Sequence, residues 1–595
     1  MSSDRGPAAT VWGRRIAALL VAAAGGMPGI AARAGIAGAP ATAATPAATT
    51  AAANSAPASA APASADSEFV QTVRGVIESA RHPLLKWCDF PYYQDEMQGL
   101  YAPLADGPVW LASGQPRPQV DDVLDVLRDA GNRGLDPTDY DVDLLASRLA
   151  ALRAGNPLEP HELALFDTAL SLAYLRCISD LHIGRITPRR VNMGFDVESK
   201  KYDLPDLVRR ALAENRIRQT ADAAEPQLAV YRRLKAVLQT YRQLAQDGAW
   251  PPLRIDATVR PGDAFPDLAA LAQRLATLGD LDAAAAAAAQ PGSPYTGEIV
   301  AAVQRFQGRH GLGADGVLGA KTAAALDVPP ARRLRQIEFA LERLRWLPDL
   351  SGGKFLAVNI PAFLVWGFDS LNAAGRPALS MRVVVGKALD TRTPVFVAEM
   401  EYVVFRPYWN VPYSIVRGEL LPALRRDPGA LAARDMEIVR GFDDATALPA
   451  TPENIGQLAA GALKVRQRPG PRNALGAVKF IFPNRENVYM HDTPSTALFA
   501  RTRRDFSHGC IRLEDPVAMA QFVIADQLEW TRERILVAMR GNRPERVDLR
   551  RPIAVILFYT TALVDLEGKV HFYDDIYGHD ARIEKELESG YPFQP

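Results

Sequence analysis

Cysteine and histidine are scarce in this sequence, which has three cysteines and eight histidines in 595 residues. Cys88, Cys177 and Cys510 cannot all pair with one another, so at least one thiol is expected to be free. The absence of a C-x-x-C pair argues against a zinc ribbon. An excess of one charge is also lacking, because 68 Lys and Arg balance 68 Asp and Glu. That balance argues against a nucleic-acid-binding protein, which usually carries a basic surplus.

Long hydrophobic runs are absent beyond the N-terminal region. There, Arg14-Arg15 precedes a short apolar run interrupted by Gly and Pro, and Ala32-Arg33-Ala34 forms an A-x-A pattern. This order is typical of a secretory signal peptide, which we predict over residues 1–34. An uncleaved membrane anchor is the alternative, although the run is marginal for spanning about 30 Å of hydrocarbon. Export predicts an oxidising compartment, where an odd cysteine indicates a free thiol.

Composition then divides the chain. Residues 35–66 are almost entirely Ala, Pro, Thr, Ser and Gly, which predicts a disordered linker. Residues 67–257 contain three segments with apolar side chains at three- and four-residue spacing, which predicts amphipathic helices over 120–135, 166–184 and 230–245. We expect a helical domain here, with Cys88 and Cys177 buried and inert.

A compact helical unit is predicted over residues 258–330, where one helix ends at a Gly-rich turn and another begins after Gly319. Its sequence resembles the small three-helix peptidoglycan-binding module, which implies that it contacts glycan strands or serves only as a scaffold. The matching positions are Val303, Phe306, Gln307, Gly311, Leu312, Asp315, Gly316, Val317, Gly319 and Thr322.

The periodicity changes after a linking helix at 331–351. Residues 352–540 contain β-branched and aromatic runs bounded by Gly, Pro or Asn, which predict the strands of a mainly-β domain. Residues 412–475 interrupt these strands with helical patterns and are interpreted as an inserted cap or lid. Residues 541–595 are expected to complete this domain with two strands, joined at Glu567-Gly568, and a surface helix. The fold class is therefore a multidomain α+β protein.

The stretch Tyr489–Pro516 contains the strongest candidates for catalytic residues. Cys510 is a candidate nucleophile, and His491 and His508 are candidate bases that could take its proton. Gly509 lets the backbone turn tightly, so that peptide N–H groups can converge on an oxyanion. Either the Asp492 carboxylate or a backbone carbonyl could orient the imidazole. A buried inert thiol and a zinc site remain alternatives from composition alone, although the spacing fits no common zinc motif.

This stretch resembles the catalytic signature of the L,D-transpeptidase (YkuD) family, in which a histidine precedes Ser/Thr-His-Gly-Cys. Here fifteen residues, 492–506, separate His491 from the run Ser507-His508-Gly509-Cys510. Arg512 stands where many members carry arginine. The segments 406–415 and 466–484 and the domain order resemble the large, YcbB-like Gram-negative branch of that family.

The resemblance implies a cell-wall enzyme in the periplasm. Cys510 would attack the diaminopimelate carbonyl of a tetrapeptide stem and release D-alanine. The thioester would then pass to an amine of a second stem and form a 3→3 cross-link. His491 would be the base. No metal or organic cofactor is expected, and carbapenem-type β-lactams are expected to acylate Cys510.

The same resemblance assigns supporting roles. The N–H groups of Gly509 and Cys510, with the Tyr489 hydroxyl, would hold the oxyanion. Ser507 and His508 would shape the loop. Arg512 and Trp409 would contact substrate, although Trp409 and Tyr489 could be only core aromatics and Arg512 only an ion-pair partner.

Three functions stay open at this point. The first is a transpeptidase, whose acceptor is a second stem, a free D-amino acid or a lipoprotein lysine. The second is an L,D-carboxypeptidase, which passes the acyl group to water, and the third is a wall-binding scaffold without activity. The expected partners are peptidoglycan stems and glycan strands, with wall-synthesis enzymes as further candidates.

Overall fold

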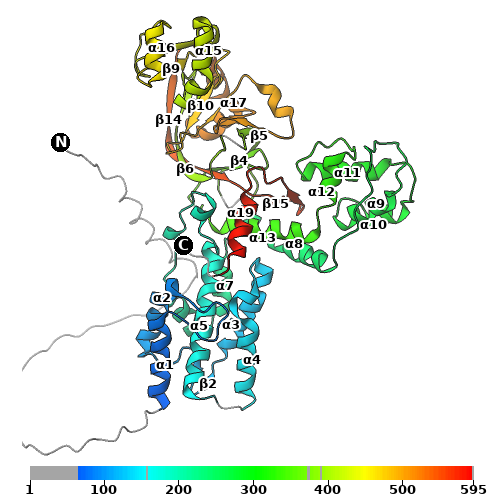
Figure 1. Cartoon of the computed structure of the whole chain (residues 1–595), viewed down its shortest axis with the longest axis vertical. Coiled ribbons are helices and arrows are strands. Elements are labelled where there is room, and N and C mark those ends of the chain that lie inside the picture. The colour runs from blue at the N-terminus through cyan, green and yellow to red at the C-terminus, as the bar shows by residue number, and fades with distance from the viewer. Residues whose placement is uncertain (1–64, 156–157, 351, 371–374, 389–390, 592–595) are drawn as a thin grey trace, which may run out of the picture. The chain divides into compact units, whose positions relative to one another are not determined.

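The computed structural model describes residues 65–155, 158–350, 352–370, 375–388 and 391–591 (Figure 1). The predicted signal peptide lies outside these residues, as does the predicted linker except for its last two positions. Those two residues differ from the prediction, because helix α1 (Ala65–Ser79) already begins at Ala65. In the part of the chain described, no helix combines the length and the apolar character needed to cross a bilayer.

A helical domain forms around α5 (Pro160–Ile183), which packs against five other helices of this domain. A capping box between Glu159 and Glu162 starts α5, and Gly184, with a φ of +84°, ends it. The sequence predicted an amphipathic helix here, but every residue from Ala164 to Ile178 is buried. Helix α5 is therefore buried on all sides at the centre of its domain, with polar residues such as Asp167 and Arg176 among its buried positions. The others are α1, α2 (Gln94–Tyr101), α3 (Gln119–Arg128), α4 (Val142–Arg153), α6 (Leu204–Ala213) and α7 (Ile217–Ala224), with a small hairpin of β1 (Leu111–Ala112) and β2 (Gln115–Pro116).

Helix α8 (Ala229–Gln246), predicted as part of the helical domain, packs along α13 (Pro330–Arg345). Its buried side chains, such as Leu234 and Leu238, belong to the same apolar cluster as the strands of the β domain. The two helices therefore extend the core of the β domain toward the helical one.

The module between α8 and α13 has its own core around Tyr295, Phe306 and Leu318. It contains α9 (Leu268–Thr277), α10 (Ala283–Ala288), α11 (Gly297–Arg309) and α12 (Ala320–Leu326). The prediction of three helices was thus one short, because the six-residue alanine run of α10 carries no amphipathic pattern. Gln307 explains part of the sequence pattern: its Oε1 accepts the Gly316 N–H at 2.8 Å, and its Nε2 donates to Asp315 Oδ1 at 3.0 Å.

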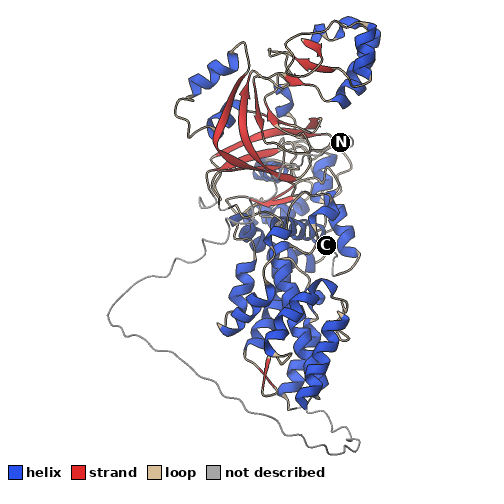
Figure 2. Ribbon diagram, turned by 90° about the vertical axis from the view of Figure 1, so that its left-hand side faces the viewer, coloured by secondary structure: helices blue, strands red, loops and turns tan. Residues whose placement is uncertain are grey.

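The β domain is a nine-stranded sheet in the order β12-β5-β13-β11-β10-β6-β14-β3-β4, and β4 also pairs with β5. This last pairing closes eight of the strands into a ring, with β12 outside it at the edge of β5 (Figure 2). The strands are β3 (Phe355–Asn359), β4 (Leu364–Phe368), β5 (Leu379–Gly386), β6 (Phe396–Phe405), β10 (Val478–Ile481), β11 (Met490–His491), β12 (Asp505–Ser507), β13 (Ile511–Leu513) and β14 (Glu545–Phe558), with helices α17 (Pro516–Val523) and α18 (Arg532–Arg540).

The insertion is a small subdomain with its own core, which includes Val416, Leu424, Leu458 and Val465. Helical patterns predicted its helices but not its sheet, whose strands are too short to show a period of two. It contains β7 (Trp409–Asn410), β8 (Met436–Val439) and β9 (Lys464–Gln467) in the order β7-β9-β8, and helices α14 (Tyr413–Ile415), α15 (Leu421–Arg426) and α16 (Pro452–Ala459). A π-helical turn, Val416–Leu420, joins α14 to α15.

The C-terminal strands differ from the prediction. β14 joins the ring between β6 and β3, but the hairpin of β15 (Ala562–Val564) and β16 (Val570–Phe572) is a separate two-stranded sheet. The turn at Glu567-Gly568 does connect two strands, and β15 packs on α8 and α13 rather than on the ring. Helix α19 (His579–Glu588) is also less superficial than expected, since Asp580 pairs with Arg343 at 2.6 Å and both side chains are buried.

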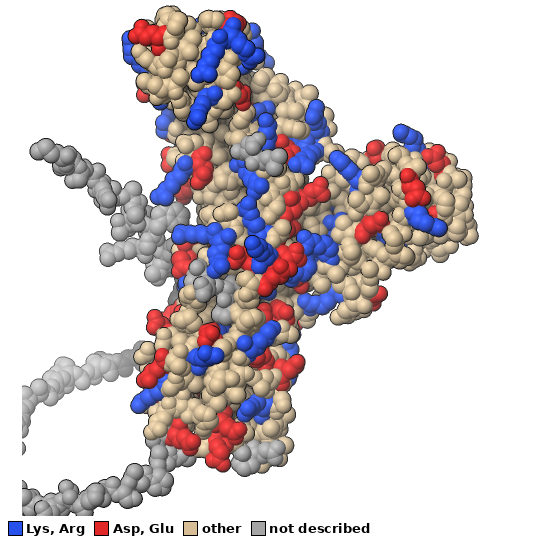
Figure 3. Space-filling model, viewed as in Figure 1, with Lys and Arg blue, Asp and Glu red and all other residues tan. Residues whose placement is uncertain are grey.

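Positive and negative side chains are interspersed over the face of the described residues in Figure 3. This distribution agrees with the formal net charge of zero.

Candidate active site

Strands β11 and β13 bring the two central residues of the candidate site together. They pair in parallel, with Met490 opposite Ile511 and His491 opposite Arg512. Paired residues of neighbouring strands point to the same face, and so do residues two apart on one strand. Cys510 immediately precedes β13 and lies two residues before Arg512. The side chains of Tyr489, His491, Cys510 and Arg512 therefore share one face of the sheet.

His491 has the hydrogen bonding expected of a neutral base. Its Nδ1 lies 2.5 Å from the backbone oxygen of Asp492, an acceptor, so Nδ1 carries the proton and donates it. That tautomer leaves the lone pair on Nε2. Burial, together with the nearby Arg512, lowers the pKa of His491 to about 3, although the hydrogen bond to the Asp492 backbone acts in the opposite direction. The imidazole is therefore neutral at physiological pH.

The Asp492 side chain points to the backbone instead. Its Oδ2 accepts the Ala477 N–H at 2.8 Å, and its Oδ1 accepts the Thr493 N–H at 2.6 Å. Of the two orienting groups considered from the sequence, the structure places the backbone carbonyl, and not the carboxylate, against the imidazole.

Cys510 is half-buried, and its thiol is neutral in this state. Burial raises its pKa to about 11, although Tyr489 and Arg512 act in the opposite direction. Its Sγ lies 3.8 Å from the backbone oxygen of Asn487, a residue that the sequence pattern did not single out. The thiol and imidazole are thus a neutral pair, and the thiolate has to form by proton transfer during attack on a carbonyl.

Gly509 lies between Cys510 and the two residues predicted to shape the loop, Ser507 and His508. Its φ of +113° is a conformation that residues with a side chain rarely adopt. The Ser507 hydroxyl accepts the Gly509 N–H at 3.2 Å and donates to the Cys510 carbonyl at 2.6 Å. Ser507 therefore shapes the loop, and the Gly509 N–H must leave Ser507 before it can donate to an oxyanion.

A support for this loop was missed by sequence reasoning. The Thr393 hydroxyl donates to the Gly509 carbonyl at 2.7 Å and accepts the Gly386 N–H at 2.9 Å. Tyr577 donates to the Gly386 carbonyl at 2.6 Å. A Cβ on Gly386 would lie 1.9 Å from the Thr391 carbonyl oxygen, so no other residue fits there. These residues are too distant along the chain from Gly509 for any local pattern to have indicated them.

The predicted substrate contacts border the same face. Arg512 is half-buried, burial lowers its pKa, and its Nε has no hydrogen-bond partner among the described residues. Burial also raises the pKa of Tyr489 well above its usual range, and the adjacent Cys510 and Trp409 affect it too. Trp409 lies on β7, where the inserted subdomain begins.

His508 is exposed, and its Nε2 lies 2.9 Å from Glu419 Oε1 in the π-helical turn of the inserted subdomain. This contact leaves His491 as the better placed base of the two considered.

Metal ligation was the remaining alternative for these side chains. Across the residues that the structure describes, no group of three or more His, Cys, Asp or Glu side chains is placed to hold a metal ion. Cys88, Cys177 and Cys510 are all free thiols. Cys177 is buried as predicted, whereas Cys88 is half-exposed, contrary to the prediction.

Comparison with known proteins gives three family matches along the chain. Residues 95–238 match a scaffold domain, residues 266–326 a "Putative peptidoglycan binding domain", and residues 353–535 the L,D-transpeptidase catalytic domain (YkuD). A Haemophilus influenzae protein named "Putative L,D-transpeptidase" is 31% identical over 242 residues. The alignment spans 41% of this chain and about half, 47%, of that relative.

Proposed function

We propose that this chain, which carries an L,D-transpeptidase catalytic domain together with scaffold and peptidoglycan-binding domains, cross-links the stem peptides of peptidoglycan through a thioester on Cys510. The observation that carries the proposal is the common face of His491 and Cys510, which the parallel pairing of β11 with β13 creates inside that domain.

Acylation begins with two neutral groups. As the Cys510 sulfur attacks the diaminopimelate carbonyl of a tetrapeptide stem, its proton moves to Nε2 of His491. The developing oxyanion is held by backbone N–H groups at Gly509 and Cys510 and by the Tyr489 hydroxyl. Collapse of the tetrahedral intermediate breaks the amide bond, and the imidazolium returns its proton to the departing amine. D-alanine leaves, and the acyl group stays on sulfur as a thioester.

Deacylation reverses these roles. An amine of a second stem loses a proton to His491 and attacks the thioester, and Cys510 leaves and is reprotonated. The product is a 3→3 cross-link. Arg512 supports this assignment because its Nε lacks a hydrogen-bond partner among the described residues and suits a substrate carboxylate. We place the reaction in the periplasm, after export by the N-terminal segment.

The experiment is incubation of the purified full chain with a disaccharide-tetrapeptide, with the products read by mass. A dimer that has lost one D-alanine supports cross-linking. Conversion to the tripeptide alone would replace the proposal by an L,D-carboxypeptidase, and an unchanged substrate would replace it by a wall-binding scaffold. Adding a lysine-terminated lipoprotein peptide tests that acceptor directly.

Two variants make this assay specific. Cys510→Ala should form no product. Cys88→Ser is the matched control, since Cys88 is also a half-exposed free thiol but lies in the helical domain. It should keep full turnover, and equal loss in both variants would contradict the assignment of Cys510.

A further inference from the structure

A lysine lies next to the proposed base on the same face of the sheet. Strand β10 pairs with β11 in the antiparallel direction, and Lys479 is directly opposite His491. Residues opposite each other in such a pair point to the same face. Because His491 is in turn opposite Arg512, the three side chains form one row across β10, β11 and β13. His491 therefore has a basic residue on each side.

The ammonium group of Lys479 has no counter-ion in the protein. Lys479 is half-buried, and within the part of the chain that the structure describes its side chain has no hydrogen-bond or ion-pair partner. Burial lowers the pKa of this lysine. The carboxylate of Asp492, the residue after His491, is already occupied by two backbone N–H groups. A half-buried cation without a partner costs free energy, and a ligand carboxylate would compensate it.

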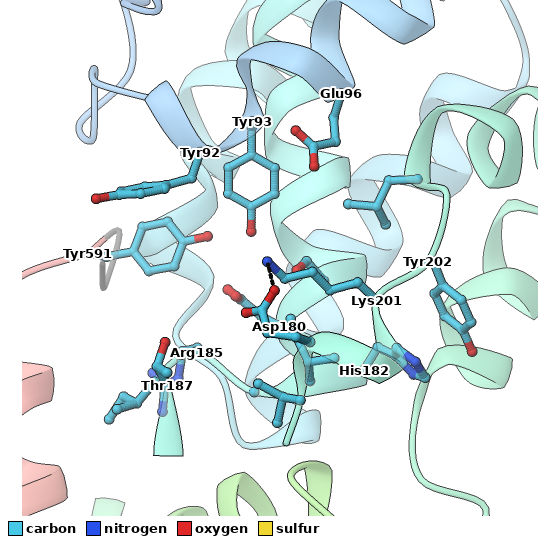
Figure 4. Close-up of a pocket in the computed structure, with 17 residues that line it drawn as sticks. Tyr92, Tyr93, Glu96, Asp180, His182, Arg185, Thr187, Lys201, Tyr202 and Tyr591 are labelled. Carbon is cyan, nitrogen blue, oxygen red and sulfur yellow. Dashed lines mark ion pairs between the residues drawn. The ribbon is translucent and has the colours of Figure 1, made fainter. Parts of the chain in front are cut away.

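Other lysines in partly enclosed positions show the usual arrangement. Lys235, which is also half-buried, pairs with Glu225 at 2.6 Å. Lys201 lines a cavity of the helical domain and pairs with Glu198 at 2.9 Å (Figure 4). The lack of a partner at Lys479 is thus a feature of the candidate active site and not of the lysines of this chain in general.

The proposed reaction brings a carboxylate to this place. His491 gives a proton to the amine of the departing D-alanine and later takes one from the amine of the second stem. In both molecules the amine nitrogen is bonded to a carbon that also carries a carboxylate, because D-alanine and the free end of diaminopimelate are both α-amino acids. A carboxylate one carbon away from a nitrogen that contacts His491 lies within reach of a long side chain on the neighbouring strand.

We propose that Lys479 binds the carboxylate of the amine partner in both half-reactions, first that of the departing D-alanine and then that of the acceptor. This inference rests on the proposed transpeptidase function and names the residue that selects its acceptor. The acyl carbonyl is at Cys510, on the β13 side of His491, so Arg512 is left for a carboxylate of the acyl part. Lys479, on the β10 side, receives the amine part.

A single site for both carboxylates has a consequence for acceptor choice. It favours the α-amino acid end of a second stem, or a free D-amino acid, over water. It also disfavours the ε-amine of a lysine, which has no carboxylate on the carbon that carries the nitrogen.

The test measures how the thioester divides its acyl group between two acceptors. The purified full chain is incubated with the disaccharide-tetrapeptide and equal concentrations of D-methionine and D-methioninamide, and the products are read by mass. Wild type should favour the free acid. In Lys479→Met the ratio of acid to amide product should fall about ten-fold or more, the effect of losing one hydrogen bond between charged groups. Comparing ratios between proteins cancels the different basicities of the two amines.

The leaving group gives a second measurement. Wild type should release D-alanine from the free tetrapeptide with a higher kcat/KM than it releases D-alaninamide from the tetrapeptide amide, and Lys479→Met should lower this ratio by a similar factor. Lys479→Gln should behave like Lys479→Met, whereas Lys479→Arg keeps the charge and should retain both preferences. Unaltered ratios in Lys479→Met and Lys479→Gln would overturn the inference, as would an equal loss in Lys479→Arg.

Lys464→Met is the matched control. Lys464 is also a half-buried lysine on a strand, but it lies in the inserted subdomain and donates its Nζ to the Gly461 carbonyl at 3.0 Å. It should keep both preferences, and thermal unfolding of all four variants should match wild type. A wild-type protein that forms cross-links without preferring acid over amide would overturn this inference alone. Wild type that releases no D-alanine would overturn the proposed function with it.

Discussion

His508 and Glu419 lie 89 residues apart in the chain, and the Nε2 of one is 2.9 Å from the Oε1 of the other. This contact links the loop that carries Cys510 to the inserted subdomain. Both side chains are substantially exposed, at 40% and 53%. Exposed pairs of this kind contribute about 0–1 kcal/mol to stability, so the contact positions the subdomain rather than stabilising the fold.

Glu419→Gln is therefore expected to raise KM roughly two- to ten-fold, the effect of losing about 1 kcal/mol of positioning free energy, and to leave kcat unchanged. Steady-state kinetics with the disaccharide-tetrapeptide measures both. Glu453→Gln, at another exposed acid of the same subdomain, is the control and should behave as wild type. A fall in kcat as large as that of His491→Ala would instead place Glu419 in the chemical step.

Tyr489→Phe tests the hydroxyl beside the thiol. Loss of one oxyanion donor typically costs about 100-fold or more in kcat, with KM unchanged. Tyr408→Phe is the matched control, since Tyr408 packs under Arg466 next to Trp409 and has no assigned role. Wild-type turnover in Tyr489→Phe would show that Tyr489 is only a packing aromatic.

The pKa of Cys510, raised to about 11 by burial, predicts how the substrate-free protein reacts with iodoacetamide. Only about one thiol in ten thousand is ionised at pH 7, so the alkylation rate should rise about ten-fold per pH unit up to pH 10. Quenched time courses read by peptide mass give the rate at Cys510 separately from that at Cys88. A rate already constant at pH 7 would indicate a preformed thiolate–imidazolium pair.

His491 should make the folded state sensitive to acid. Its pKa is about 3 when folded and near 6.5 when unfolded, so between these values the unfolded chain binds the extra proton. Stability is therefore complete above pH 6.5 and falls as pH drops toward 3, by about 1.4 kcal/mol per pH unit from this group.

Urea unfolding at pH 7.0 and pH 4.5 measures this loss. His491→Asn should lose less stability between the two pH values than wild type. His161→Asn is a control at an exposed histidine of the helical domain, and an identical loss for wild type and His491→Asn would contradict the assignment.

A carbapenem should acylate Cys510 and form a stable thioester. Intact-mass spectrometry of treated protein should show one adduct in wild type and in Cys88→Ser and none in Cys510→Ala. An adduct that persists in Cys510→Ala would mean that the drug reacts elsewhere.

The sequence by itself determined the features that depend on neighbours along the chain. The spacing of apolar residues predicted α3, α5 and α8, and β-branched runs predicted the longer strands of the sheet. The fifteen residues between His491 and Ser507, together with the run that follows them, were sufficient to indicate the family. These signals are local, because a helix or strand periodicity and a catalytic-loop motif each extend over no more than a few tens of residues.

The tertiary structure decided which of these pieces meet. The periodicity of a segment indicates which of its side chains are buried, but not which other segment buries them. For this reason α5 was predicted to be amphipathic, and the β15–β16 hairpin was assigned to the wrong sheet. Ring closure through β4 and β5, the parallel pairing that puts His491 and Cys510 on one face of the sheet, and the Thr393 support of Gly509 join distant segments. Such contacts depend on chain topology and on the burial of apolar area, which no short motif encodes.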